Sequence, residues 1–316
     1  MTFDLRRVRT SGGDVAYADL GDGPVVLLLH GFPQSSFVWR DLAPLLASRF
    51  RVIAPDLLGA GDSDKPVDAP LSLDAQTGYV RELLDALGVE RFAAVGHGFG
   101  GGIAQRLALD GADVDALVLI DSIAFDAWPS QAIGQAQRTP PEDQTEALVR
   151  TAMLAAFRAG TVHPARLTEE VLGRYLRPFA GTDGAAAFFR FAHALDGQGL
   201  TGREADLGKL EIPVLIFWGE DDPFLPVGVA ERLNAAIPSS TLGLVPGCGH
   251  FLVDDAVETI GPMIHEYLRA RYLRAPHGHT DPTGAVMIQL ERRPPWLDLD
   301  DDEEDDRPDA QDEEDA

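Results

Sequence analysis

Short apolar runs alternate along the chain with segments whose apolar residues recur at helical spacing. Continuous apolar runs of this length are typical of strands that are buried on both faces of a sheet. Because the expected strands alternate with helices, we predict one mostly parallel central sheet flanked by helices, an α/β architecture. The expected strands occupy residues 24–31, 51–56, 91–96, 116–121, 213–219 and 240–247, and the expected helices 37–49, 74–88, 99–110, 226–236 and 256–273.

The alternation breaks between residues 124 and 208, where the chain is rich in Ala, Arg and Phe at helical spacing and has no convincing strand. We interpret this segment as a helical cap that is inserted between two strands of the sheet. The predicted organisation is a first part of the core (1–123), the cap (124–208), a second part of the core (209–274) and a C-terminal extension (275–316).

Negative charge is concentrated at one end of the 316 residues. The formal net charge is −25, and residues 298–316 hold thirteen Asp or Glu and one Arg, which contributes −12 and leaves −13 for the rest. Phosphate contacts need clustered Lys and Arg, so a general nucleic-acid partner is excluded. The acidic tail is expected to be disordered. It is either a solvated solubility segment or a docking arm for a basic partner.

Neither a membrane segment nor a secretion signal is apparent. No run of about 18 uncharged apolar residues occurs, and residues 1–10, MTFDLRRVRT, lack the apolar stretch of a signal peptide. The single cysteine, Cys248, leaves no internal disulfide framework. We therefore expect a cytoplasmic protein with no membrane partner.

The stretch FAAVGHGFGGGIAQ, residues 92–105, joins an expected strand to an expected helix through a cluster of glycines. From Gly96 onwards it matches the dinucleotide-binding pattern G-x-G-x-x-G, and Asp121 follows near the position of a ribose-binding acid. It also matches a nucleophile elbow, G-x-Nuc-x-G, flanked by Gly96 and Gly100. In that second interpretation, Gly98 takes the nucleophile position and has no side chain.

Four further motifs, each after an expected strand, favour the elbow. They are HGFPQSSFVWR, PDLLGAGDSDKP, WGEDDPFLP and GCGHF, at residues 30–40, 55–66, 218–226 and 247–251. In these motifs the chain resembles the α/β-hydrolase fold family, and most closely its epoxide hydrolase and haloalkane dehalogenase branch, from about residue 5 to 273. Four ordered motifs are more specific than one glycine pattern. The resemblance implies an α/β-hydrolase fold with a helical cap.

The resemblance also implies roles for individual residues. Asp222, in G-x-x-D-x-x-x-P, matches the family's catalytic acid, although the neighbouring Asp221 is easily confused with it. His250 in GCGHF matches the base that this acid orients. The backbone N–H groups of Phe32 and Phe99 correspond to the two donors of an oxyanion hole. The resemblance implies no metal and no other cofactor.

Gly98 is the point at which the chain departs from the family. Relatives carry Asp or Ser there, and these form an alkyl-enzyme ester or an acyl-enzyme respectively. Glycine can form neither, although it adopts the positive φ of the elbow without strain. The chain is therefore either an enzyme that uses His250 and Asp222 in non-covalent base chemistry or an inactivated hydrolase. The alternative function is that of a catalytically dead binding or interaction module.

Aromatic side chains near these motifs predict an apolar pocket for a small apolar molecule, such as an ester or an epoxide. The residues expected to border it are His30, which also shapes its turn, and Trp128, Tyr175 and Phe224. Phe occupies both positions at which dehalogenases typically hold halide, which weakens dehalogenation. Tyr175 is the only cap tyrosine where epoxide hydrolases usually have two, which weakens epoxide opening. His97 is expected to be structural. Asp121 is expected to cap the end of its strand, and the alternative is a catalytic acid at the position that some dehalogenases use.

Overall fold

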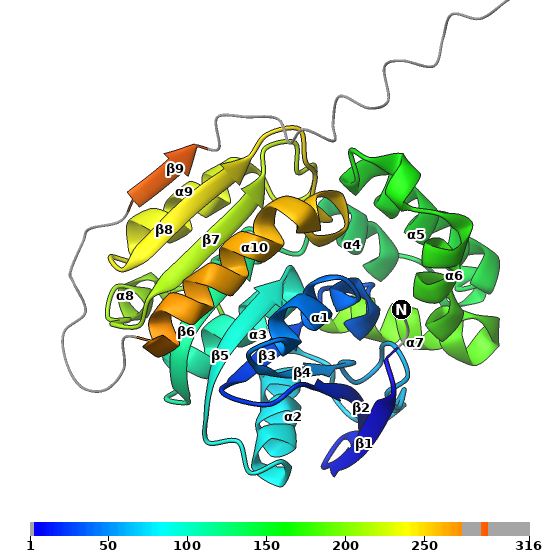
Figure 1. Cartoon of the computed structure of the whole chain (residues 1–316). Helices are drawn as coiled ribbons and strands as arrows, with labels where there is room; N and C mark the ends of the chain where they lie inside the picture. Colours follow the sequence, from blue (N-terminus) through cyan, green and yellow to red (C-terminus); the bar gives the residue numbers. More distant parts are fainter. Residues whose placement is uncertain (1–2, 274–285, 290–316) are drawn as a thin grey trace, which may run out of the picture.

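The computed structural model describes residues 3–273 and 286–289. Within that part of the chain, one sheet has the strand order β1-β2-β4-β3-β5-β6-β7-β8-β9 (Figure 1). The pairs β1–β2 and β2–β4 are antiparallel and the others are parallel, so the predicted mostly parallel sheet is confirmed. The strands are β1 (Leu5–Thr10), β2 (Gly13–Leu20), β3 (Val25–Leu29), β4 (Arg51–Pro55), β5 (Arg91–His97), β6 (Asp113–Ile120), β7 (Val214–Gly219), β8 (Ser240–Val245) and β9 (Val286–Gln289).

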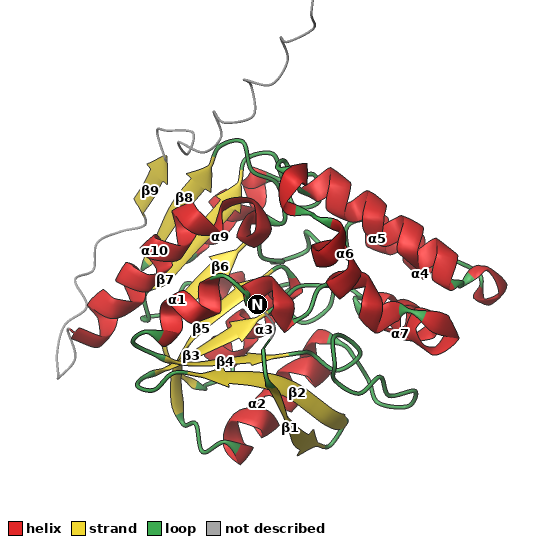
Figure 2. Ribbon diagram, turned by 45° about the vertical axis from the view of Figure 1, so that its right-hand side comes forward, coloured by secondary structure: helices red, strands yellow, loops and turns green. Residues whose placement is uncertain are grey.

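Helices cover both faces of this sheet, as the alternation of elements predicts (Figures 1 and 2). On one face, α1 (Leu42–Ala47) packs beside α10 (Leu252–Leu273). On the other face, α2 (Leu73–Ala86) packs beside α3 (Phe99–Leu109), and α9 (Val227–Ala236) contacts β7 and β8. Among the described residues, no helix is both long enough and apolar enough to cross a membrane.

Between β6 and β7 the chain leaves the sheet and forms a group of helices on one side of the molecule (Figure 2). This group, the cap, consists of α4 (Gln131–Gln137), η2 (Pro141–Asp143), α5 (Glu146–Gly160), η3 (Pro164–Arg166), α6 (Glu169–Leu176), η4 (Arg177–Phe179) and α7 (Gly181–Ala194), and the short helix α8 (Glu204–Leu207) leads back to β7. Threonine hydroxyls explain where two of these helices begin. Thr145 accepts from the N–H of Leu148 before α5, and Thr168 accepts from that of Val171 before α6.

Three elements differ from those expected from the sequence. The expected helix 37–49 is divided into η1 (Ser36–Trp39) and α1. The last long helix begins at Leu252, before the expected residue 256, and Ala256 has a non-helical φ of −141° inside it. Strand β9 lies in the predicted C-terminal extension, yet its backbone pairs with β8 and adds a ninth strand. The acidic tail, 298–316, lies outside the described residues.

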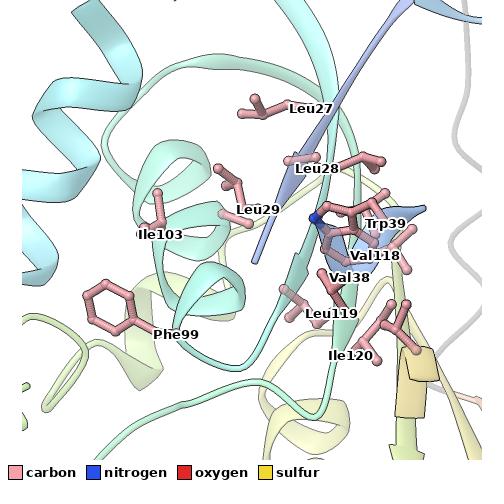
Figure 3. Close-up of a cluster of buried hydrophobic side chains, with 14 of the residues drawn as sticks. Leu27, Leu28, Leu29, Val38, Trp39, Phe99, Ile103, Val118, Leu119 and Ile120 are labelled. Carbon is pink, nitrogen blue, oxygen red and sulfur yellow. The ribbon is translucent and has the colours of Figure 1, made fainter. Parts of the chain in front are cut away.

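The alternating side chains of β3 show how the sheet is buried on both faces. Leu27 and Leu29 lie on the side of α3, with Ile103, whereas Leu28 lies on the opposite side with Trp39 (Figure 3). All five side chains are completely buried. Because successive residues of a strand face opposite sides, a strand covered by helices on both sides must be apolar throughout. This requirement explains the uninterrupted apolar runs in the sequence.

Candidate active site

The glycine cluster forms a tight turn between β5 and α3. A Cβ at Gly100 would lie 2.1 Å from the carbonyl oxygen of Leu29, and one at Gly96 would lie 2.5 Å from the oxygen of Gly100. A Cβ at Gly101 would lie 2.1 Å from the hydroxyl of Ser122. These three glycines let α3 approach the sheet closely, which explains their presence without a bound phosphate.

Gly98 is constrained in a different way. Its φ of +52° lies in the left-handed region, which glycine adopts freely. A Cβ built on Gly98 would meet nothing closer than the Cα of Gly31, at 3.6 Å, and Nε2 of His250, at 3.7 Å. These are ordinary van der Waals distances, so the space beside Gly98 accepts a side chain. Such a side chain would point toward the imidazole of His250.

His250 and Asp222 form a buried hydrogen-bonded pair. Nδ1 of His250 lies 2.8 Å from Oδ2 of Asp222, and because an ionised carboxylate only accepts, Nδ1–H donates. The other oxygen of Asp222 accepts from the N–H groups of Phe224 and Leu225, at 2.7 and 3.0 Å. Asp221 is exposed, and the contact with the imidazole therefore distinguishes Asp222 from its neighbour.

The loop that carries Phe32 lies next to the beginning of α3. Gly31 is the nearest neighbour of the Gly98 Cβ position, and Phe99 is the first residue of α3. The first N–H groups of a helix have no acceptor within the helix and point outward. The two backbone segments that the resemblance assigns to the oxyanion hole therefore meet beside Gly98.

A cavity of about 120 Å³ opens between the cap and the core above this point. Its lining is almost entirely apolar and aromatic, and none of its residues is Lys, Arg, Asp or Glu. The lining comprises Phe32, Pro33, Phe99, Trp128, Ser130, Ala132, Ile133, Ala136, Ala152, Met153, Ala156, Phe188, Leu195, Phe224, Leu225, His250 and Phe251. It includes the expected Trp128 and Phe224 and the rings of Phe32 and Phe99.

Two residues expected at the pocket lie elsewhere. His30 is fully buried beneath the turn, where Nδ1–H donates to the oxygen of Gly31 at 2.8 Å and Nε2 accepts from the N–H of Leu57 at 2.9 Å. Burial lowers the pKa of this imidazole and keeps it neutral. Tyr175 is buried too, and its hydroxyl donates to Asp254 at 3.0 Å. Both side chains are engaged inside the protein, so the prediction that they line the cavity is corrected.

His97 and Asp121 make the structural contacts expected of them. Nε2–H of His97 donates to the backbone oxygen of His250 at 2.8 Å, and burial lowers the pKa of His97 to about 3. Oδ1 of Asp121 accepts from the N–H of Gly219 at 2.8 Å, and burial raises the pKa of this carboxyl well above its usual range. Asp121 therefore caps the end of β6 next to β7, while Asp222 orients the imidazole.

Sequence reasoning missed two acidic residues that follow His250. Asp254 is buried and pairs with Arg40 at 2.8 Å, while also accepting from Tyr175 and from the amide of Gln34. Asp255 accepts from the backbone N–H groups of Gly249, at 3.0 Å, and of the cap residues Val162 and His163. The available signal was a pair of acidic residues within an apolar segment, FLVDDAV.

A mostly parallel sheet covered on both faces, a group of helices inserted between β6 and β7 and a buried His–Asp pair beneath these helices define an α/β protein of the hydrolase type. The family model of the alpha/beta hydrolase fold matches residues 24–257. Haloalkane dehalogenase 2 of Mycobacterium tuberculosis is 31% identical over 277 residues, which cover 84% of this chain and 94% of that protein. The chain belongs to the α/β-hydrolase fold family.

Two further comparisons support this assignment. The crystal structure of an alpha/beta hydrolase fold protein from Burkholderia ambifaria superimposes with a TM-score of 0.77 at 32% identity, covering 84% of this chain and 97% of that chain. A soluble epoxide hydrolase from a Corynebacterium species is 42% identical over 127 residues, which cover 38% of this chain and 43% of that protein. These proteins are similar to this chain. The dehalogenase and epoxide hydrolase activities in their names are those of the named proteins and are not assigned to this chain.

Proposed function

We propose that this chain is an enzyme of the α/β-hydrolase family that uses the His250–Asp222 pair as a general base on a small, uncharged apolar substrate. The observation that carries the proposal is the imidazole itself. Its Nδ1–H is held by a buried carboxylate at 2.8 Å, and its Nε2 faces the space beside Gly98 at the floor of the apolar cavity. No covalent bond to residue 98 is part of this reaction.

The chemistry follows from the proton that Nε2 can accept. A water molecule beside Gly98 would give its proton to Nε2 as its oxygen attacks the substrate, and Asp222 would stabilise the imidazolium that forms. With an ester, negative charge develops on the carbonyl oxygen, and the N–H groups of Phe32 and Phe99 would stabilise it. Sites that lose a triad member retain catalysis of roughly 10³–10⁴-fold over water from the oxyanion hole and binding.

Size and charge of the cavity support the proposed substrate class. A cavity of about 120 Å³ is slightly smaller than an engineered apolar cavity of about 150 Å³ that binds benzene. An anionic substrate would lose its hydration in a lining without Lys or Arg, which is unfavourable for an unpaired charge. We therefore expect an uncharged ester or epoxide with a small ring or a short alkyl chain.

The deciding experiment compares the chain with Gly98→Asp, Gly98→Ser and His250→Ala. Each protein is assayed with aryl esters, epoxides and bromoalkanes of four to six carbons. We expect turnover by the unchanged chain that His250→Ala abolishes. Turnover that appears only when Asp or Ser stands at position 98 would instead identify an inactivated covalent hydrolase.

The absence of a side chain at Gly98 favours a second candidate function, a binding module without catalysis. In that case the apolar cavity would hold a ligand and His250 would have no chemical task. Binding of small apolar molecules, measured by calorimetry, would then be the same in His250→Ala, and no assay would detect turnover. A loss of activity in this variant would exclude the binding module.

A further inference from the structure

The cavity between the cap and the core has a few polar groups in an otherwise apolar lining. Of its lining residues within the described part of the chain, three have a nitrogen or oxygen atom in the side chain, namely Trp128, Ser130 and His250. His250 follows β8, whereas Trp128 and Ser130 lie two residues apart in the segment between β6 and α4. A few polar groups in an apolar pocket are what fixes the orientation of a ligand. A ligand that fills this cavity meets such groups from two separate segments of the chain.

The indole of Trp128 is buried without a hydrogen bond. Trp128 is 5% exposed, and its Nε1–H has no acceptor among the described residues. The ring packs edge-on against Phe99, with 6.1 Å between the ring centroids, and both rings belong to the cavity lining. An indole N–H only donates, and a buried donor without an acceptor is unfavourable. A ligand atom that accepts this hydrogen bond would remove the penalty.

Ser130 provides a second polar group in the lining, two residues after Trp128. It is the N-cap residue of α4, a position where a serine hydroxyl usually accepts from a backbone N–H. Its side chain makes no such capping bond, and no hydrogen bond within the described residues uses this hydroxyl. Since a carbonyl or ether oxygen has two lone pairs, the hydroxyl can donate to the same ligand oxygen that accepts from Trp128.

The lining determines the charge of the ligand group that these two residues can bind. An indole N–H and a hydroxyl supply hydrogen bonds but no positive charge. Because the lining contains no Lys or Arg, an anion would lose its hydration without gaining a cationic partner from those residues. An uncharged oxygen gains the hydrogen bonds, while the remainder of the ligand gains by burying apolar surface. The two residues therefore favour an uncharged acceptor.

We propose that Trp128 and Ser130 form a recognition site for a second, uncharged oxygen of the substrate, separate from the group that water attacks. The inference rests on the proposed function for its reaction, although the binding itself needs no turnover. A cavity slightly smaller than one that holds benzene admits about six or seven non-hydrogen atoms. The substrate class is thereby narrowed to short esters or epoxides that also carry an ether or ketone oxygen.

Binding is tested with cyclopentanone and methylenecyclopentane, which have the same shape and differ by an oxygen in place of a CH₂ group. The full chain is labelled with ¹⁵N in its four tryptophans, and the Trp128 indole signal is the one that Trp128→Phe removes. We expect cyclopentanone to move this indole proton downfield saturably, because an N–H···O bond forms, and methylenecyclopentane to move it much less. Equal shifts with both ligands, a response to bromide ion in place of cyclopentanone, or no saturable shift at all would overturn the proposal.

Substrate selectivity is tested with two matched pairs, methyl methoxyacetate with methyl butanoate and glycidyl methyl ether with 1,2-epoxypentane. Within each pair, an ether oxygen replaces a CH₂ group. We expect Trp128→Phe to lower the ratio of kcat/KM for the ether over that for its partner by about three- to tenfold, the effect of losing one uncharged hydrogen bond. Ser130→Ala should lower the ratio less. Because each ratio is compared between proteins, the intrinsic reactivities cancel, and an unchanged ratio in both variants contradicts the proposal.

Trp39→Phe is the matched control. The Nε1–H of Trp39 is also buried without an acceptor among the described residues, but Trp39 lies in the core beside Leu28 and does not line the cavity (Figure 3). Removing this N–H should leave both the Trp128 shift and the substrate ratios unchanged. A fall in the ratios equal to that in Trp128→Phe would show that loosened packing, and not recognition of an oxygen, is the cause.

This inference and the proposed function fail separately in these experiments. A chain whose Trp128 signal responds to cyclopentanone as expected, but which turns over neither esters nor epoxides, retains the recognition site and contradicts the proposed reaction. A chain that loses turnover in His250→Ala, but whose Trp128 signal does not distinguish the two ligands, retains the reaction and contradicts the recognition site.

Discussion

At the scale of single residues, the glycines around the turn after β5 are alike in the sequence and different in the structure. Gly100 is required because a Cβ would overlap the backbone oxygen of Leu29, at 2.1 Å. Gly98 has free space but a positive φ. Only the three-dimensional surroundings separate a glycine that the fold needs from one that a side chain could replace.

This difference predicts opposite outcomes for two substitutions. Gly98→Ser should fold, with a free energy of unfolding lower by about 1–3 kcal/mol, because a residue with a Cβ is strained at positive φ. Gly100→Ala should prevent native packing of α3 on the sheet. Urea unfolding and circular dichroism measure both. A Gly100→Ala variant that unfolds cooperatively, with a free energy of unfolding equal to that of Gly98→Ser, would contradict this interpretation.

His97 gives a pH-dependent prediction. Its folded pKa of about 3 lies below the value near 6.5 expected in the unfolded chain, so the unfolded state binds more protons between these values. Stability is therefore present above pH 6.5 and is lost as the pH falls toward 3. Burial is the main cause, and the facing groups are His250, Asp222 and His30.

The test compares the chain with His97→Gln, whose amide can still donate to the oxygen of His250. Lowering the pH from 7 to 5 should destabilise the unchanged chain by about 2 kcal/mol more than the variant. Urea unfolding at the two pH values measures the difference. If the free energy of unfolding falls by the same amount in both proteins between pH 7 and pH 5, His97 does not control the acid sensitivity.

At the scale of elements, a buried ionic cluster joins η1, α6 and α10. Arg40 is bonded to Asp254, which also accepts from Tyr175 of the cap. The carboxylate is completely buried, and the guanidinium is 12% exposed. Removing one partner of such a pair leaves an uncompensated buried charge, which is strongly destabilising, whereas the intact pair adds little net stability.

We therefore expect a ranking of three substitutions in this cluster. Asp254→Ala should lower the free energy of unfolding by about 3–5 kcal/mol, and Tyr175→Phe by about 1 kcal/mol. The double variant Arg40→Met with Asp254→Leu should be more stable than Asp254→Ala alone, because no charge stays unpaired. Urea unfolding of the three proteins gives the ranking, and equal losses would contradict it.

At the scale of the whole molecule, Asp255 connects the cap to the loop that carries His250. Its carboxylate accepts from the N–H groups of Val162 and His163, which follow the end of α5, and from that of Gly249, the residue before His250. The N–H of Phe251 also donates to the oxygen of Gly160, the last residue of α5, at 3.0 Å. The cap is thus fastened to the core close to the candidate base.

Hydrogen exchange can test whether the cap opens as a unit about this connection. In Asp255→Ala, amides of α5, α6 and α7 should exchange about tenfold faster, because several hydrogen bonds that favour the closed cap are lost. Amides of β5 and β6 should keep their rates. The control is Asp126→Ala, which removes an exposed ion pair with Arg232 that should contribute little. Equal acceleration in cap and sheet would exclude separate opening.

The fold was predictable because its strands are buried on both faces. Runs such as 25–29 and 214–219 are apolar at every position only when helices cover both sides, so the pattern specifies the architecture. The division of 37–49 into η1 and α1 and the addition of β9 to the sheet were not predictable, because local spacing does not report where a short turn breaks or which edge a short strand joins.

The order of the motifs along the chain was enough to identify the family and to nominate Asp222 and His250, because each motif follows a strand and parallel strands end at one edge. Which side chains face the cavity was decided only by the tertiary structure. Tyr175 and His30 turned out to be hydrogen-bonded inside the protein, and Asp254 and Asp255 gained partners from the cap. A residue's type sets what it can bind, but its partners come from segments far apart in the sequence, and only folding brings these together.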